Sequence, residues 1–185
     1  MITALTIVHV AISLVGIGTG FVVMWGLLVS KRLKTWTATF LAATTATSVT
    51  GFFFPIERLT PALALGILSL IVLAPALAAR YYYDLVGPWR RTYVITAMIA
   101  QYFNVFVLIV QAFQKIPSLR ELAPTQSEPP FAVAQLVTLA LFIAYTTLAA
   151  VRFRLEPSTE KSAPFEFATP HARPNVSSKT GGARQ

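Results

Sequence analysis

One histidine stands within the long apolar stretches of this chain, and the residues on its helical face indicate what it could do. His9 is followed at spacings of four, seven and eleven residues by Ser13, Gly16 and Gly20, which places all four on one side of a helix. Two interpretations stay open. Either Gly16 and Gly20 let a second helix approach closely and His9 hydrogen-bonds across that contact, or His9 ligates a metal or haem, or contacts a quinone or another small ligand.

A haem or metal at His9 would lack a second ligand. A haem cytochrome of four helices normally presents histidines from two helices to one iron, and the other histidine, His171, lies in a polar C-terminal segment. The chain has no cysteine, which excludes disulfides, thiolate ligands and iron–sulfur clusters. We therefore predict no metal site and no cofactor.

Side-chain amides form the second candidate group. Gln101, Asn104 and Gln111 fall within an arc of roughly 80° when successive residues advance by about 100° around a helix, and Gln135 stands about one turn inside the last apolar stretch. Amides in hydrocarbon need hydrogen-bond partners, which other helices or a ligand can supply. Because these residues and His9 fall at compatible depths, we predict a candidate ligand cavity that opens outward and is lined by His9, Gln101, Asn104, Gln111 and Gln135.

Five stretches without a charged residue must position these side chains. The 185 residues are 55% apolar or aromatic and 12% charged, with a mean hydropathy of +0.64. The charge-free stretches are 1–30, 35–56, 59–79, 92–114 and 129–151, and each exceeds the roughly 20 residues that a helix needs to cross a bilayer. The sequence predicts an all-α integral membrane protein in which residues 1–154 form a bundle of five transmembrane helices, at about 4–29, 37–54, 61–80, 92–114 and 131–151.

Prolines and aromatic residues mark the ends of these spans. Pro55 ends the second predicted span, Pro61 stands at the first position of the third, and Pro75 predicts a kink within it. The tyrosines at 81–83 are typical of a membrane interface. The prolines in residues 115–130 predict either a stiff connector or a lid.

Basic residues are distributed unequally among the predicted connections. Of the 15, twelve stand in residues 31–34, in residues 80–91 and after Val151, whereas three stand in residues 55–61 and 115–130. Because cytoplasmic loops carry the excess, we predict an inner-membrane protein with its N-terminus outside and its C-terminus cytoplasmic. The first stretch lacks the basic start and small-residue cleavage site of a signal peptide, so we expect it to be retained as a span.

The C-terminal segment differs in composition from the rest of the chain. Residues 155–185 are rich in proline, serine, threonine, lysine and glycine, which predicts a disordered cytoplasmic tail. The net charge of +8 does not indicate nucleic acid, because the basic residues stand at span ends and in this tail. The predicted partners are the lipid bilayer and either a second membrane protein or another copy of the chain.

The predicted spans contain no Asp, Glu, Lys or Arg, and this limits the function classes. Charges at that depth mark ion pathways and proton relays, so their absence counts against ion- or proton-coupled transport and against hydrolysis by paired carboxylates. No catalytic residue is predicted. We expect a non-enzymatic accessory subunit, or a binder or carrier of a small neutral or apolar molecule. The alternative is a membrane-embedded redox or lipid-modifying enzyme that uses a bound cofactor or quinone near His9 and the amides of the fourth span.

Overall fold

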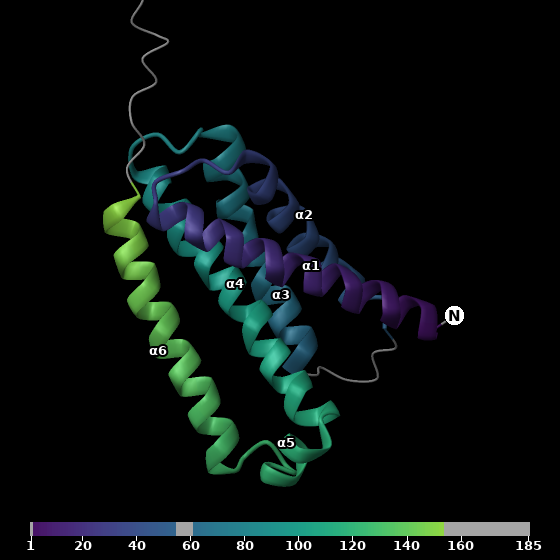
Figure 1. Ribbon diagram of the computed structural model, residues 1–185. Coiled ribbons are helices and arrows are strands. Elements are labelled where there is room, and N and C mark those ends of the chain that lie inside the picture. The colour runs from purple at the N-terminus through teal and green to yellow at the C-terminus, as the bar shows by residue number, and fades with distance from the viewer. Residues whose placement is uncertain (1, 55–60, 154–185) are drawn as a thin grey trace, which may run out of the picture. The chain divides into compact units, whose positions relative to one another are not determined.

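The computed structural model describes residues 2–54 and 61–153 of the protein, and within these ranges all regular structure is helical. The predicted all-α class is confirmed, whereas the predicted tail at 155–185 lies outside the described residues. Figure 1 follows the helices from the N-terminus at α1 to α6. Their bounds are α1 Ile2–Leu28, α2 Lys34–Gly51, α3 Pro61–Leu77, η1 Ala78–Tyr82, α4 Pro88–Lys115, α5 Pro117–Leu122 and α6 Pro129–Arg152.

Four of the described helices are long and apolar enough to cross a membrane. They are α1, α4, α6 and the continuous helix made by α3 and η1. The shorter α2 is not among them, because seven threonines and one serine in its 18 residues lower its hydropathy. By length and composition these four helices are compatible with a multi-pass membrane protein, where the sequence predicts five spans. The helix ends differ from the predicted ends by a few residues.

The third span changes its helical form shortly after Pro75. This proline lies inside α3, where it supplies no backbone N–H to the helix. The turn that follows, η1, is a π-helix, and single π turns are a known way for a helix to absorb such an interruption. The helix therefore continues through Tyr82, beyond the predicted end of this span at residue 80.

The helix α4 contacts each of the other long helices, namely α1, α2, α3 and α6 (Figure 1). Ala97 and Ala100 on its inner face have no exposed surface, and small side chains of this kind let neighbouring helices approach closely. Phe40 from α2, Leu73 from α3 and Phe142 from α6 belong to the same buried cluster. The side-chain amides of α4 therefore lie on the helix that contacts every other long helix.

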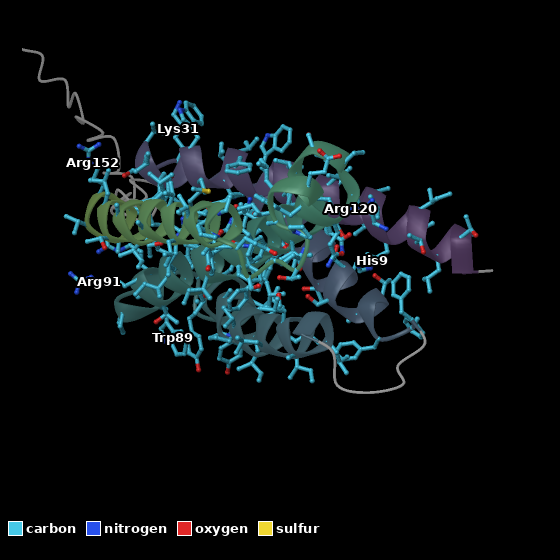
Figure 2. The ribbon with its side chains drawn as sticks, turned by 90° about the horizontal axis from the view of Figure 1, so that it is seen from below. His9, Lys31, Trp89, Arg91, Arg120 and Arg152 are labelled. Carbon is cyan, nitrogen blue, oxygen red and sulfur yellow. The ribbon has the colours of Figure 1, made fainter. Side chains whose placement is uncertain are left out.

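Two connections, from α1 to α2 and from η1 to α4, meet the end of α6 at one end of the bundle. The Ser30 hydroxyl donates to the carbonyl oxygen of Arg152 at 2.9 Å, Arg32 donates to the carboxylate of Asp84 at 2.9 Å, and Arg90 donates to the carbonyl oxygen of Phe153. Figure 2 labels Lys31, Arg91 and Arg152 at this end of the bundle, and it shows His9 near the opposite end. We call it the basic end and define it by Lys31, Arg32, Arg80, Arg90, Arg91 and Arg152.

Candidate functional site

His9 lies against α2. Its Nδ1 is 2.8 Å from the Thr50 hydroxyl oxygen, and its ring meets Phe54 edge-on at a centroid distance of 5.2 Å. The Thr50 hydroxyl donates to the carbonyl oxygen of Ala46 at 2.8 Å, which fits an Nδ1–H as the donor from His9. Ser13, one turn along α1, donates to the hydroxyl of Thr47 at 3.3 Å. The face that carries His9 is therefore packed on the hydroxyl-rich face of α2.

The same contact continues to two of the amides of α4. Gln101 has no exposed surface, and its Nε2 donates to the carbonyl oxygen of Ile17 in α1 at 2.9 Å. Asn104, which is half-buried, donates to the hydroxyl of Thr44 in α2 at 3.0 Å. A Cβ atom added at Gly16 would lie 3.3 Å from the Thr44 hydroxyl oxygen. We call this set the hydroxyl–amide seam and define it by His9, Ser13, Thr44, Thr47, Thr50, Gln101 and Asn104.

The other two predicted site residues lie elsewhere. Gln111 is exposed, and its side-chain amide makes no hydrogen bond with any described residue. Gln135 is buried in α6, where its Nε2 donates to the carbonyl oxygen of Phe106 in α4 at 3.3 Å. The structure therefore places His9, Gln101 and Asn104 along one interface and separates Gln111 and Gln135 from it. Ligand binding by these five residues stays a prediction.

The crossing of the α1 and α4 axes explains why Gln111 lies outside the seam. Gln111 is on nearly the same side of α4 as Asn104, seven residues earlier. Figure 1 shows α1 crossing α4 and then running away from it toward the N-terminus. The two helices are in contact where Gly20 faces Gln101. Farther along α4, the face that carries the amides extends beyond the region that α1 covers, and Gln111 lies there. Sequence periodicity gives the stripe but not the crossing angle.

The connection between α4 and α6 is held by its own hydrogen bonds. The Glu128 carboxylate accepts from the Thr125 hydroxyl at 2.9 Å and from the Ser127 backbone N–H at 3.1 Å. Gln126 donates to the carbonyl oxygen of Val110 in α4 at 3.1 Å. Local desolvation raises the pKa of the Glu128 carboxyl, but the hydrogen bonds it accepts outweigh this and bring the pKa below its usual 4.5. These contacts tie the connection to the end of α4.

A groove of about 610 Å³ lies between α4 and α6, a volume within the range of small-molecule sites. Apolar side chains make most of its walls, among them Ile95 and Met98 of α4 and Leu139 and Ile143 of α6. Arg91 lines it in the first turn of α4, at the basic end. The groove could not be predicted from the sequence, because the same residue types cover any span that faces lipid and only the spacing of the two helices creates the space.

Comparison with protein-family models, with curated proteins and with solved structures finds no match for this chain. The described ranges 2–54 and 61–153 also hold no group of three or more His, Cys, Asp or Glu side chains that could bind a metal ion. The function is therefore inferred from the geometry of the groove and of the seam.

Proposed function

We propose that this protein is a non-enzymatic, multi-pass protein of the inner membrane that binds one small, mostly apolar molecule in the groove between α4 and α6. The volume and the apolar lining of the groove carry this proposal. A lipid-like molecule gains about 0.8 kcal/mol for each CH₂ group that leaves water, but lipid tails solvate the same group equally well. Retention in the groove must therefore come from shape and from a polar contact.

We place the polar contact at Gln135, which lies beyond the Leu139 end of the groove and does not itself line it. Gln135 precedes Leu139, which lines the groove, by one helical turn on the same face of α6. Its Oε1 is buried and accepts no hydrogen bond from any described residue, and a buried acceptor without a donor costs about 1–3 kcal/mol. A ligand with a hydroxyl or N–H group at that end of the groove would satisfy it. The proposed ligand is thus an apolar molecule with one hydrogen-bond donor, and Gln135 is retained from the predicted site residues.

We also propose that α2 is the fifth span, which gives the topology of an outer N-terminus and a cytoplasmic basic end. Its 18 residues extend for about 27 Å, close to the ~30 Å thickness of a hydrocarbon core. Most of its hydroxyl groups have hydrogen-bond partners. Thr45 donates to the carbonyl oxygen of Leu41 at 2.7 Å, and Ser48 donates to that of Thr44 at 3.0 Å. The hydroxyl groups of Thr44, Thr47 and Thr50 take part in the seam. A helix whose polar groups are satisfied in this way is accommodated beside α1 despite its low hydropathy.

Native mass spectrometry of protein extracted gently from membranes tests the bound molecule. Ala150 lines the groove, so Ala150→Phe is expected to fill part of it and to reduce the bound small molecule at least tenfold. Ala140→Phe makes the same change at an exposed position of α6 outside the groove and is expected to retain it. Gln135→Leu should weaken retention without emptying the groove.

Three results would overturn the proposal. One is wild-type protein that carries no small molecule, and another is equal retention by the two phenylalanine variants. The third is a partner subunit in place of a small molecule, which would make the chain an accessory subunit. A Soret or flavin absorption band of the purified protein would instead support the redox enzyme.

A further inference from the structure

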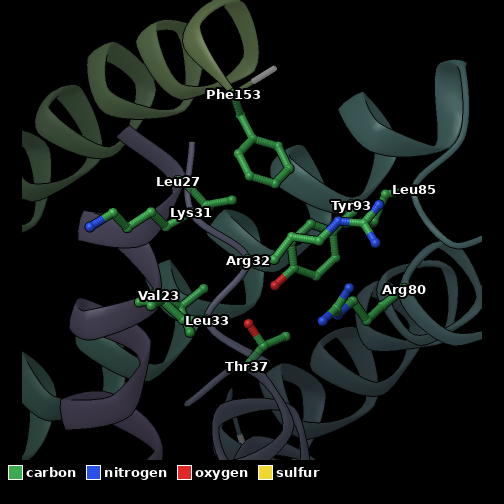
Figure 3. A pocket seen from close by; sticks show the side chains of 10 residues that line it. All are labelled: Val23, Leu27, Lys31, Arg32, Leu33, Thr37, Arg80, Leu85, Tyr93 and Phe153. Atoms are coloured by element: carbon green, nitrogen blue, oxygen red, sulfur yellow. The ribbon is translucent and has the colours of Figure 1, made fainter. Parts of the chain in front are cut away.

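A second pocket lies at the basic end and shares no lining residue with the groove. It is formed where the connection between α1 and α2 meets η1 and the first turns of α4. Its volume of about 10 Å³ accommodates about one oxygen atom, from a water molecule or from a larger group at its mouth. Thr37 and Tyr93 line it together with basic side chains (Figure 3).

The Tyr93 hydroxyl is an unusual feature of this pocket. Tyr93 is only 2% exposed, and its hydroxyl makes no hydrogen bond with any described residue. The Thr37 hydroxyl lies on the same side of the pocket in Figure 3 and interacts with the Tyr93 hydroxyl, but the pair does not meet the full distance and angle geometry of a hydrogen bond. Buried hydroxyl groups normally have a partner, so this one is available to a group that enters the pocket.

The charges around Tyr93 favour an anion as that group. Figure 3 shows the Arg80 guanidinium directed toward Tyr93 and Thr37, whereas Lys31 points away from them. Arg80 is half-buried and makes no ion pair with any described residue. Arg32 also lines the pocket, and Asp84, which accepts its hydrogen bond at 2.9 Å, balances its charge. Within residues 2–54 and 61–153, Arg80 thus has no acidic partner to balance its positive charge.

We propose that this pocket binds a phosphate group, with one phosphate oxygen accepting from the Tyr93 hydroxyl and the others facing Arg80. The source favoured by the position is the headgroup of an anionic lipid. Tyr81 and Tyr82 are strongly exposed next to Arg80, and exposed aromatic residues at a span end mark the headgroup level of a bilayer. Basic pockets between transmembrane helices are suited to such headgroups. Free inorganic phosphate offers the same oxygen atoms, and the experiment separates the two.

The test uses the full-length protein in nanodiscs of phosphatidylcholine that contain a minor fraction of phosphatidylglycerol. Native mass spectrometry after release from the nanodisc measures retained phosphatidylglycerol. Tyr93→Phe removes only the hydroxyl, and retention is expected to fall about tenfold, the effect of one hydrogen bond to a charged group. Arg80→Gln is expected to lower retention about fivefold more than Lys34→Gln, which removes a charge from an exposed side chain near the basic end that does not line the pocket.

Thermal stability without anionic lipid separates a binding role from a structural one. Because the Tyr93 hydroxyl has no partner within the described structure, Tyr93→Phe should leave the melting temperature in pure phosphatidylcholine unchanged or raise it. Competition by millimolar inorganic phosphate would identify free phosphate as the ligand, and its failure would identify the headgroup. Retention that is equal in Tyr93→Phe, Arg80→Gln and Lys34→Gln would overturn the proposal, as would a clear loss of stability in Tyr93→Phe.

Discussion

Replacement of Gly20 by alanine gives a direct test of the hydroxyl–amide seam. A Cβ atom at position 20 would lie 2.0 Å from Oε1 and 2.3 Å from Cδ of Gln101, far inside van der Waals contact. The Gln101 amide has no exposed surface, so it has little room to move aside. If it does move, Gln101 no longer donates to the carbonyl oxygen of Ile17, now at 2.9 Å. One methyl group therefore disrupts the contact between α1 and α4.

The expected magnitude follows from a matched substitution on the same helix. Overpacking costs about 1–3 kcal/mol, and loss of the interhelical hydrogen bond adds about 0.6 kcal/mol. Gly18→Ala brings neither cost, because nothing lies within 4 Å of a Cβ at Gly18. Both variants share the gain in helix propensity of about 1 kcal/mol, which cancels in the comparison. The free energy of unfolding of Gly20→Ala should thus be lower than that of Gly18→Ala by about 2–4 kcal/mol.

Reversible unfolding by sodium dodecyl sulfate in mixed micelles, followed by far-ultraviolet circular dichroism, measures this difference. Adding Gln101→Ala to Gly20→Ala removes the amide that the new methyl group displaces, so the double variant should regain part of the stability. Equal unfolding free energies for Gly20→Ala and Gly18→Ala would refute the reasoning. A further loss in the double variant would show that the clash at Gln101 is not the cause.

Three further predictions concern the amides, the topology and the connection before α6. Asn104→Leu should lower the free energy of unfolding by about 0.6–2 kcal/mol through its lost hydrogen bond, whereas Gln111→Leu should leave it unchanged; chemical unfolding compares them. Reporter enzymes active only outside the cytoplasm should work when inserted at Leu122 and fail when fused at Gln185, and the reverse would contradict the topology. Because the pKa of Glu128 lies below its usual 4.5, its hydrogen bonds should hold at neutral pH and weaken as pH falls through the lowered pKa. The protection factors for hydrogen exchange of the Thr125 and Ser127 amides, whose N–H groups donate to the Glu128 carboxylate, should then fall in acid, and in Glu128→Gln already at neutral pH.

The apolar spans could be predicted from sequence, because charges are costly in hydrocarbon and therefore mark where helices end. The helix ends are less well predicted. The fourth span begins at Pro88, four residues before the predicted start, since a proline at the first position favours a helix and the arginines that follow continue it. The short helix at Pro117–Leu122 starts in the same way, in a region predicted as a connector or lid.

The candidate site could be predicted only in part. The face shared by His9 and Ser13 is a matter of helical period, and the structure shows it packed on α2. Which helix faces it depends on the order and crossing of helices, which periodicity does not contain. The same limit applies to Tyr93, an ordinary aromatic residue in the sequence, whose isolated hydroxyl becomes evident only when the surrounding helices are in place.

The hydroxyl-rich face of α2 bears on how the chain enters the membrane during synthesis. The helix α1 leaves the ribosome before α2, and residues 29–33 join the two helices. Lipid alone would retain α2 poorly, whereas α1 offers His9 and Ser13 as hydrogen-bond partners as soon as the two helices lie side by side. With α2 as the proposed fifth span, the two should therefore insert as a hairpin before α3 is made. Substitutions at this contact should then appear in cells mainly as misinserted and degraded chains, and less as altered behaviour of the protein that has been assembled.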